Sequence, residues 1–219
     1  MIVRVDARRE HLRQRLRQPL PGLAAQMQMA PRPRTPLEPS VTPDALRQAA
    51  ALLLVYEQDG QWHIPLTVRG AALRQHTGQV SLPGGRLDRG ETAERAALRE
   101  AYEEIGLMPD VVDILGTLTP LPIAISGHLL HPVVGFARHR PQFVIAEHEV
   151  ARLLEVPLSQ LQPGSVRWER RMRSQPPLEP MDVPFFPVDD VQVWGATAMV
   201  LAEFMAIVSE IDAHLGRLR

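Results

Sequence analysis

Hydrophobic residues occur with strand-like spacing in the first half of the chain. Residues 49–56 form a nearly continuous apolar run, and residues 62–69 follow with partial alternation after the turn residues Gln58, Asp59 and Gly60. Two such runs joined by a short turn predict a β-hairpin. Further short strands are predicted at 80–82, ending at Pro83-Gly84-Gly85, around 112–118 and around 131–137.

Helical spacing follows the hairpin. Residues 92–105 predict a helix with Thr92 as its N-cap and Gly106 as its C-terminal stop. A short helix is predicted at 149–155, and a final helix at about 196–215. Strands interrupted by helices in this irregular order predict an α/β fold, in which a mixed sheet is covered on both faces.

The N-terminal segment has a character of its own. Leu12 and Leu16 are one helical turn apart and are surrounded by arginines, which predicts a basic helix over residues 6–17. A membrane-surface helix is one interpretation, but so few apolar residues favour a docking helix or a homodimer contact. Five prolines between residues 31 and 43 exclude a helix or a central strand and predict an extended linker. We therefore divide the chain into residues 1–43 and a principal domain of residues 44–219.

Composition narrows the classes of protein. The 219 residues are 45% hydrophobic, which suits one principal domain with a real core. The net charge of −1 gives no general attraction to nucleic acid or to an anionic membrane. No stretch reaches the roughly 20 apolar residues of a membrane span, and the N-terminus lacks the apolar run of a signal peptide. We expect a cytoplasmic protein without a nucleic-acid or membrane partner.

Cysteine and lysine are both absent from the sequence. The absence of cysteine excludes disulfides, a thiol nucleophile and cysteine-ligated metals, and it suits a reducing cytoplasm. Every one of the 24 basic residues is arginine, so neither Schiff-base catalysis nor the lysine of a phosphate-binding P-loop is available.

Three carboxylates share one face of the predicted helix over 92–105. Glu100, Glu103 and Glu104 fall within an arc of about 100°. Like charges at this spacing destabilise a helix by about 0.2–0.5 kcal/mol per pair, so the cluster makes sense if a cation binds there. Oxygen ligands favour Mg²⁺ or Mn²⁺, which can assist the attack of water on a diphosphate. A Glu-x-x-Glu-Glu sequence alone is more often a solvated surface.

The wider pattern around these acids resembles the Nudix box. Ala101 departs from it, because the family usually has a larger aliphatic residue there. The resemblance implies an α/β/α sandwich in which Glu100, Glu103 and Glu104 bind metal and Arg99 pairs with Glu91. The seven fixed positions are Gly85, Glu91, Arg99, Glu100, Glu103, Glu104 and Gly106.

A second motif, residues 66–85, resembles the signature of coenzyme A pyrophosphatases within this family, with mild departures at Gly70 and Leu82. Segments 131–134 and 193–197 are also similar. Arginine and histidine side chains in the motif can bind phosphate next to the metal helix, although each can also be an ordinary surface or loop residue. The candidate substrate-binding residues are Arg69, Arg74, His76, Gln79, Gly84 and Gly85.

The resemblance implies hydrolysis of coenzyme A or acyl-coenzyme A to adenosine 3',5'-bisphosphate and 4'-phosphopantetheine or its acylated form. Two alternatives stay open: a Nudix hydrolase of ADP-ribose or oxidised nucleotides, and a non-catalytic nucleotide-sensing Nudix module. Glu103 is the candidate general base, with Glu147 or Glu149 as alternatives. The pantetheine arm needs a partly apolar groove, which residues 122–130 or the region of Trp194 can line; Trp194 can equally be core.

Overall fold

The computed structural model describes residues 2–37, 42–70, 79–173 and 178–217, which form four α-helices, eleven strands and short 3-10 turns. The helices are α1 (Ile2–Leu16), α2 (Gly22–Gln26), α3 (Ala93–Ile105) and α4 (Gly195–Arg217). The strands are β1 (Arg47–Gln58), β2 (Gln61–Arg69), β3 (Val80–Ser81), β4 (Gly84–Arg86), β5 (Asp113–Thr117), β6 (Leu121–Ile123), β7 (His128–Ala137), β8 (Val150–Pro157), β9 (Arg167–Met172), β10 (Pro180–Val188) and β11 (Val191–Trp194).

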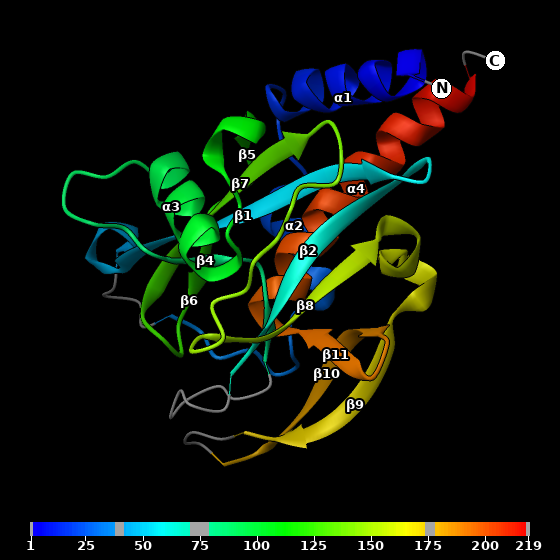
Figure 1. Cartoon of the computed structure of the whole chain (residues 1–219). Coiled ribbons are helices and arrows are strands. Elements are labelled where there is room, and N and C mark those ends of the chain that lie inside the picture. Colours follow the sequence, from blue (N-terminus) through cyan, green and yellow to red (C-terminus); the bar gives the residue numbers. More distant parts are fainter. Residues whose placement is uncertain (1, 38–41, 71–78, 174–177, 218–219) are drawn as a thin grey trace.

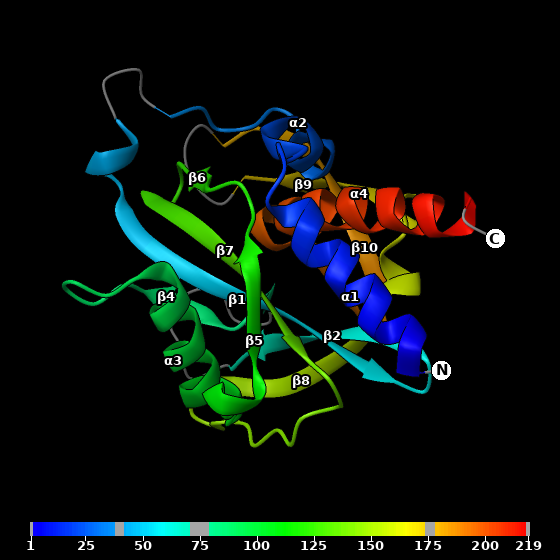
Figure 2. The same cartoon turned by 90° about the horizontal axis from the view of Figure 1, so that it is seen from above.

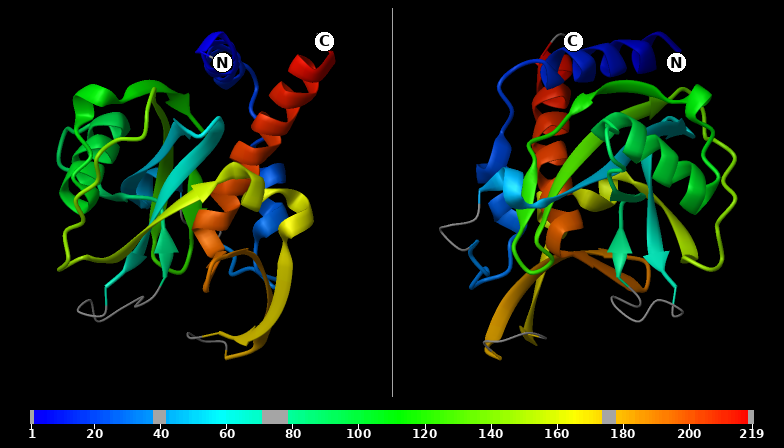
Figure 3. Two further views of the ribbon diagram at one scale, coloured as in Figure 1. Left: turned by 45° about the vertical axis from the view of Figure 1, so that its right-hand side comes forward. Right: turned by 90° about the vertical axis from the view of Figure 1, so that its left-hand side faces the viewer.

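The main sheet has eight strands and mixed polarity. β1 runs parallel to β7 and antiparallel to β2 and β4, while β8 pairs with the other edge of β2. The two-residue turn between β1 and β2 consists of Asp59 and Gly60, both at positive φ, as a tight hairpin requires. β9, β10 and β11 form a separate antiparallel sheet at one end of the molecule (Figure 3).

β1 explains why the sheet is covered on both faces. Ala51, Leu53 and Val55 belong to the hydrophobic cluster under α4 and α1, while Leu52 and Leu54 belong to the cluster under α3. Because side chains alternate along a strand, a strand covered on both faces needs an unbroken apolar sequence. Figures 1 and 2 show α3 on one face of the sheet and α4 with α1 on the other. The predicted mixed α/β fold is confirmed.

The N-terminal helix docks on the chain itself. Leu12 and Leu16 are buried in the main hydrophobic cluster, and α1 packs against α4 and β5. Arg8 and Arg15 on α1 pair with acidic residues of α4 at 2.7 and 2.6 Å. No helix within the described residues has the length and apolar character needed to cross a bilayer. The division of the chain into residues 1–43 and 44–219 stays a prediction, and so does the formation of a homodimer.

One predicted element is wrong. Residues 149–155 are not helical, because Val150–Pro157 forms strand β8. The spacing of Val150, Leu153 and Leu154 imitates a helix, but β8 pairs with β2 through seven registered residue pairs and buries Leu154 and Val156. Sheet pairing therefore overrides local periodicity. The chain also resumes as β4 after Pro83, where the sequence predicted the end of a strand.

A buried carboxylate ties the segment after α1 to the final helix. Glu203 on α4 is fully buried. Its oxygens accept hydrogen bonds from the Gly22 N–H (3.0 Å), the Gln26 amide (2.8 Å) and the Thr119 hydroxyl (2.7 Å). Buried carboxylates persist where several donors satisfy them, so this network holds α2 against α4.

We expect Glu203→Ala to lower the free energy of unfolding by about 3 kcal/mol, because buried donors lose their acceptor. Urea denaturation measures the change. Glu210→Gln is a matched control on the same helix, since Glu210 pairs with Arg15 at the surface and is expected to cost at most about 1 kcal/mol. Equal effects of the two substitutions would contradict a special role for Glu203.

Candidate functional site

The helix that carries the acidic cluster begins and ends where the sequence predicts. The Thr92 hydroxyl accepts a hydrogen bond from the Arg95 N–H (3.4 Å), and Gly106 ends α3 at φ 65°. Ala101 and Ile105 are buried against the sheet. These contacts fix the rotation of α3 and turn the opposite, acidic face outward.

The segment before β8 is held on the C-terminal end of α3. The Val144 N–H donates to the Ile105 carbonyl and the Ala146 N–H to the Glu104 carbonyl, both at 2.9 Å. A Cβ on Gly106 would lie 3.0 Å from Val144, so glycine permits this close approach. The last carbonyls of α3 thus find partners, and Glu149 is brought close to the acidic face.

Arg99 connects the loop before α3 to the acidic face. Its guanidinium donates to both Glu91 oxygens at 3.0 and 2.9 Å, and to the Arg86 carbonyl at 3.0 Å. It also donates to Glu100 at 2.8 Å and Glu103 at 3.2 Å. These bonds hold the pKa of Glu91 below its usual value. The implied Arg99–Glu91 pair is therefore present, and Arg99 also offsets charge on two of the three acids.

Two adjacent glycines allow β4 to lie close to its neighbours. A Cβ on Gly84 would lie 2.3 Å from the Ala50 carbonyl oxygen, and a Cβ on Gly85 would lie 2.4 Å from the Glu100 carboxylate. Gly84 therefore permits packing against the backbone of β1, and Gly85 leaves room for a functional side chain. Both residues were predicted to contact substrate; the structure also gives each a packing reason to be glycine.

Glu104 is the most perturbed carboxyl group of the site. Burial raises the pKa of Glu104 to about 8, helped by the negative charges of Glu100 and Glu149. Burial also raises the pKa of Glu100. The Oε2 atom of Glu104 is buried without a hydrogen-bond partner among the described residues. A buried oxygen without a donor is costly, so the site favours a ligand that supplies positive charge.

The arrangement fits an open divalent-metal site rather than a closed cage. Within the described parts of the chain, no three acidic or histidine side chains converge closely enough to hold an ion by themselves. Mg²⁺ commonly binds through one or two carboxylates, with water and substrate phosphate completing its shell. Glu100 and Glu104 match this need, whereas the Glu103 side chain is 53% exposed and turned toward Arg99. The three-glutamate ligand set stays a prediction.

Arg69 lies at the end of β2 beside this acidic face. Its positive charge is near enough to Glu104 to oppose the rise in the pKa of Glu104. The Arg69 N–H donates to the Gln79 carbonyl (3.0 Å), and the neighbouring Gly70 N–H donates to the Glu149 carbonyl (2.9 Å). Arg69, which was predicted to bind substrate, therefore lies close to Glu104, as Glu149 does. The predicted Arg74 and His76 lie outside the described residues.

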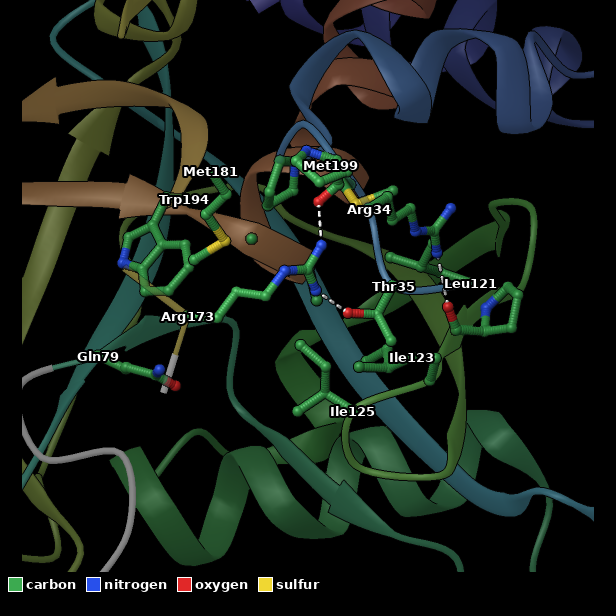
Figure 4. A pocket seen from close by; sticks show the side chains of 16 residues that line it. Arg34, Thr35, Gln79, Leu121, Ile123, Ile125, Arg173, Met181, Trp194 and Met199 are labelled. Atoms are coloured by element: carbon green, nitrogen blue, oxygen red, sulfur yellow. Dashed lines mark hydrogen bonds between the residues drawn. The ribbon is translucent and has the colours of Figure 1, made fainter. Parts of the chain in front are cut away.

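An apolar cavity lies between the main sheet and the smaller one. It has a volume of about 320 Å³ and is lined by Ile123, Ile125 and Trp194 among others, with Gln79 at one side (Figure 4). The sequence predicted an apolar groove at residues 122–130 or near Trp194, and both regions contribute. The sequence did not predict that residues near 31–35 line it too, since a proline-rich stretch carries no signal for a binding site.

Comparison with known proteins identifies the domain that carries this site. Residues 46–177 match the NUDIX domain family model. The chain is 39% identical over 126 residues to "Uncharacterized Nudix hydrolase NudL" of Enterobacter sp. (strain 638), covering 57% of this chain and 65% of that protein. The protein of the same name from Pectobacterium atrosepticum is 40% identical over 125 residues, with the same two coverages. The match thus spans 65%, just under two thirds, of these relatives' length.

The fold has a counterpart among solved structures. The crystal structure of a Nudix hydrolase from M. Smegmatis, RenU, superimposes on this chain with a TM-score of 0.54 at 23% identity. The similarity covers 75% of this chain and 87% of that one. It supports the arrangement of helices around a mixed sheet.

Proposed function

The chain belongs to the Nudix family, and from that premise we propose that it hydrolyses the diphosphate bond of coenzyme A or an acyl-coenzyme A with the help of Mg²⁺ or Mn²⁺. The observation that carries the proposal is the buried, unpartnered oxygen of Glu104 beside Glu100 and Glu149. Water adds to one phosphorus, the bond from that phosphorus to the bridging oxygen breaks, and the bridging oxygen leaves on the other phosphate.

Each side chain of the site has a distinct task in this proposal. Glu100 and Glu104, with Glu103 beside them, hold the metal ion, which supplies charge neutralisation as negative charge grows on the diphosphate. Arg99 fixes the loop through Glu91 and is a positioning residue. Arg69 binds a phosphate oxygen at the edge of the acidic face. The closeness of Arg69 to Glu104 supports this proposal of an anion-binding group next to a cation-binding one.

The general base is Glu149 or Glu103. Glu149 lies close enough to Glu100 and Glu104 to raise the pKa of both. Glu103 is on the same helix as the metal candidates, but its carboxylate is half exposed and hydrogen-bonded to Arg99. A base must reach the attacking water, so the position of Glu149 across from α3 favours it.

We expect Glu149→Gln to lower kcat about a hundredfold, because proton removal from water loses its acceptor. The Mg²⁺ concentration that gives half-maximal activity should stay within about twofold of the wild type. Glu147→Gln tests the third base named from the sequence and is expected to keep the wild-type kcat, because Glu147 is exposed on the same segment. A large loss of kcat in Glu103→Gln together with normal kcat in Glu149→Gln would assign the base to Glu103 instead.

Residues 66–85 support coenzyme A as the substrate class through their resemblance to the pyrophosphatase signature. The decisive experiment incubates the full chain and Mg²⁺ with coenzyme A, acyl-coenzyme A, ADP-ribose and oxidised nucleoside triphosphates, and identifies the products. Release of adenosine 3',5'-bisphosphate is the expected result. Cleavage of ADP-ribose or a nucleoside triphosphate alone would replace coenzyme A as the substrate, and binding without cleavage would indicate a sensing module.

Arg69→Ala should lower kcat/KM for coenzyme A by about tenfold to a hundredfold, the range expected for losing a charged hydrogen bond to phosphate. Arg152→Ala is the control, because Arg152 lies on the neighbouring strand β8 and pairs with Asp190 at the surface. Unchanged kinetics in Arg69→Ala would remove Arg69 from the binding site.

A further inference from the structure

The cavity between the two sheets is built from segments far apart in the chain. Its walls come from residues between 31 and 35, from 121–125 and from 194–199, together with Met181 and Arg173. Most of these side chains are aliphatic, aromatic or thioether groups. In Figure 4 they surround one space, which is the kind of environment that takes an apolar ligand group.

Arg34 and Arg173 also line the cavity. Protein groups bind both guanidinium groups, so these charges add little polarity to the cavity. The Arg34 guanidinium donates to the Pro122 carbonyl at 2.8 Å, and its aliphatic stem faces the cavity. Arg173 donates to the Thr35 hydroxyl and the Pro33 carbonyl. Its side chain is only 8% exposed, and Glu179 pairs with it at 3.2 Å. The hydrogen bonds of the two arginines thus hold residues 33–35 in place as one wall of the cavity.

The size of the cavity indicates what fills it. An apolar cavity of about 150 Å³ holds a benzene ring, so the volume of about 320 Å³ suits roughly twelve carbon atoms. Met181 and Met199 line it with flexible thioether side chains, which adapt to chains of different length. A linear aliphatic chain fits these properties better than a second charged group does.

The cavity lies within reach of the candidate active site along the chain. Gln79 lines the cavity, and its carbonyl accepts the N–H of Arg69, the proposed phosphate ligand. Gly85, which contacts Glu100, follows six residues later, within about 20 Å of chain. One extended ligand can therefore reach from the acids into the cavity.

We propose that this cavity binds the acyl chain of a thioester substrate, so that acyl-coenzyme A with a chain of up to about twelve carbons is preferred over free coenzyme A. This inference rests on the proposed function, because it assumes that the diphosphate end of the same molecule lies at the acidic face. Burial of each methylene favours binding until the cavity is full.

The test compares coenzyme A, hexanoyl-coenzyme A and decanoyl-coenzyme A on the full chain. The value of kcat/KM is measured with Mg²⁺, and Kd is measured by calorimetry with a chelator present so that no hydrolysis is needed. Ala196→Phe and Ala124→Phe fill the cavity from two lining segments that are far apart in the chain. Ala24→Phe, at an exposed alanine of α2, is the matched control. In the wild type and in Ala24→Phe, decanoyl-coenzyme A should bind and react at least about tenfold better than coenzyme A.

The outcomes separate the acyl site from the proposed function. The decanoyl-to-coenzyme A ratio should fall to near one in both cavity variants, and this within-variant ratio does not depend on how much protein folds. Two outcomes overturn the acyl site and leave the proposed function standing. One is cleavage of coenzyme A at a rate that does not depend on acyl-chain length. The other is a decanoyl-to-coenzyme A ratio that stays unchanged in the cavity variants. Chain-length-dependent binding that the cavity variants abolish, without cleavage, keeps the cavity assignment and overturns the proposed function. If no ligand of the series binds, both fail.

Discussion

Glu104→Gln is expected to lower the rate of diphosphate hydrolysis at least about a thousandfold, because a metal ion contributes several kcal/mol of transition-state stabilisation. Glu104 carries the buried oxygen that has no donor among the described residues, and the amide removes the negative charge that attracts the cation. The change is measured as kcat with saturating Mg²⁺, together with direct titration of Mn²⁺ binding.

The control for this substitution is on the same helix. Glu94 lies in the first turn of α3, away from Glu104, and Glu94→Gln should leave both kcat and metal binding close to those of the wild type. Full activity of Glu104→Gln would remove the basis of the proposed metal site. Loss of metal binding in Glu104→Gln with an unchanged unfolding temperature would assign the loss to the ligand rather than to folding.

Gly85→Ala should lower kcat about a hundredfold while the protein stays folded. The new methyl group would lie 2.4 Å from the Glu100 carboxylate, which is the movable end of a side chain. The carboxylate must therefore shift, and a displacement of about 1 Å at a reacting centre costs about a hundredfold in rate. Steady-state kinetics and thermal unfolding of the same preparation measure the two effects.

The preceding glycine offers a sharp contrast. In Gly84→Ala the methyl group would meet the Ala50 carbonyl oxygen at 2.3 Å and the Ala51 Cα atom at 2.6 Å, both of which are backbone atoms of β1. This change should lower the free energy of unfolding by more than about 4 kcal/mol. If Gly85→Ala instead unfolds the chain and Gly84→Ala does not, the packing around β4 differs from the structure.

The elements that the sequence predicts well are those with a strong local signal. Thr92 and Gly106 mark the ends of α3, and the turn at Asp59 and Gly60 marks the hairpin, because capping and turn geometry depend on neighbouring residues alone. The acidic face also follows from helical periodicity. Periodicity alone placed Glu100 and Glu104 on one face, whereas the Arg99–Glu91 pair was implied by the resemblance to the Nudix box.

The elements that the sequence misses depend on contacts between distant segments. β8 was predicted as a helix, because only its pairing with β2 reveals it as a strand. β9 and β10 carry charged residues and prolines that hide their strand character. Glu149 could be named only as one of several bases, since its place depends on how Val144 and Ala146 cap α3. No sequence pattern predicted that the segment around Arg34 lines the cavity.

The cavity proposed to bind the acyl chain and the helix proposed to bind metal come from different parts of the chain. The family match begins at residue 46 and ends at residue 177. Thr35 lies before its start and Met199 lies after its end, and both residues line the cavity. The glutamates of α3 lie well inside it. Under the proposed acyl site, substitutions in the flanking segments would change which ligands bind and leave the glutamates of α3 unchanged. Grafting such flanks between related chains would be a practical route to new ligand preferences.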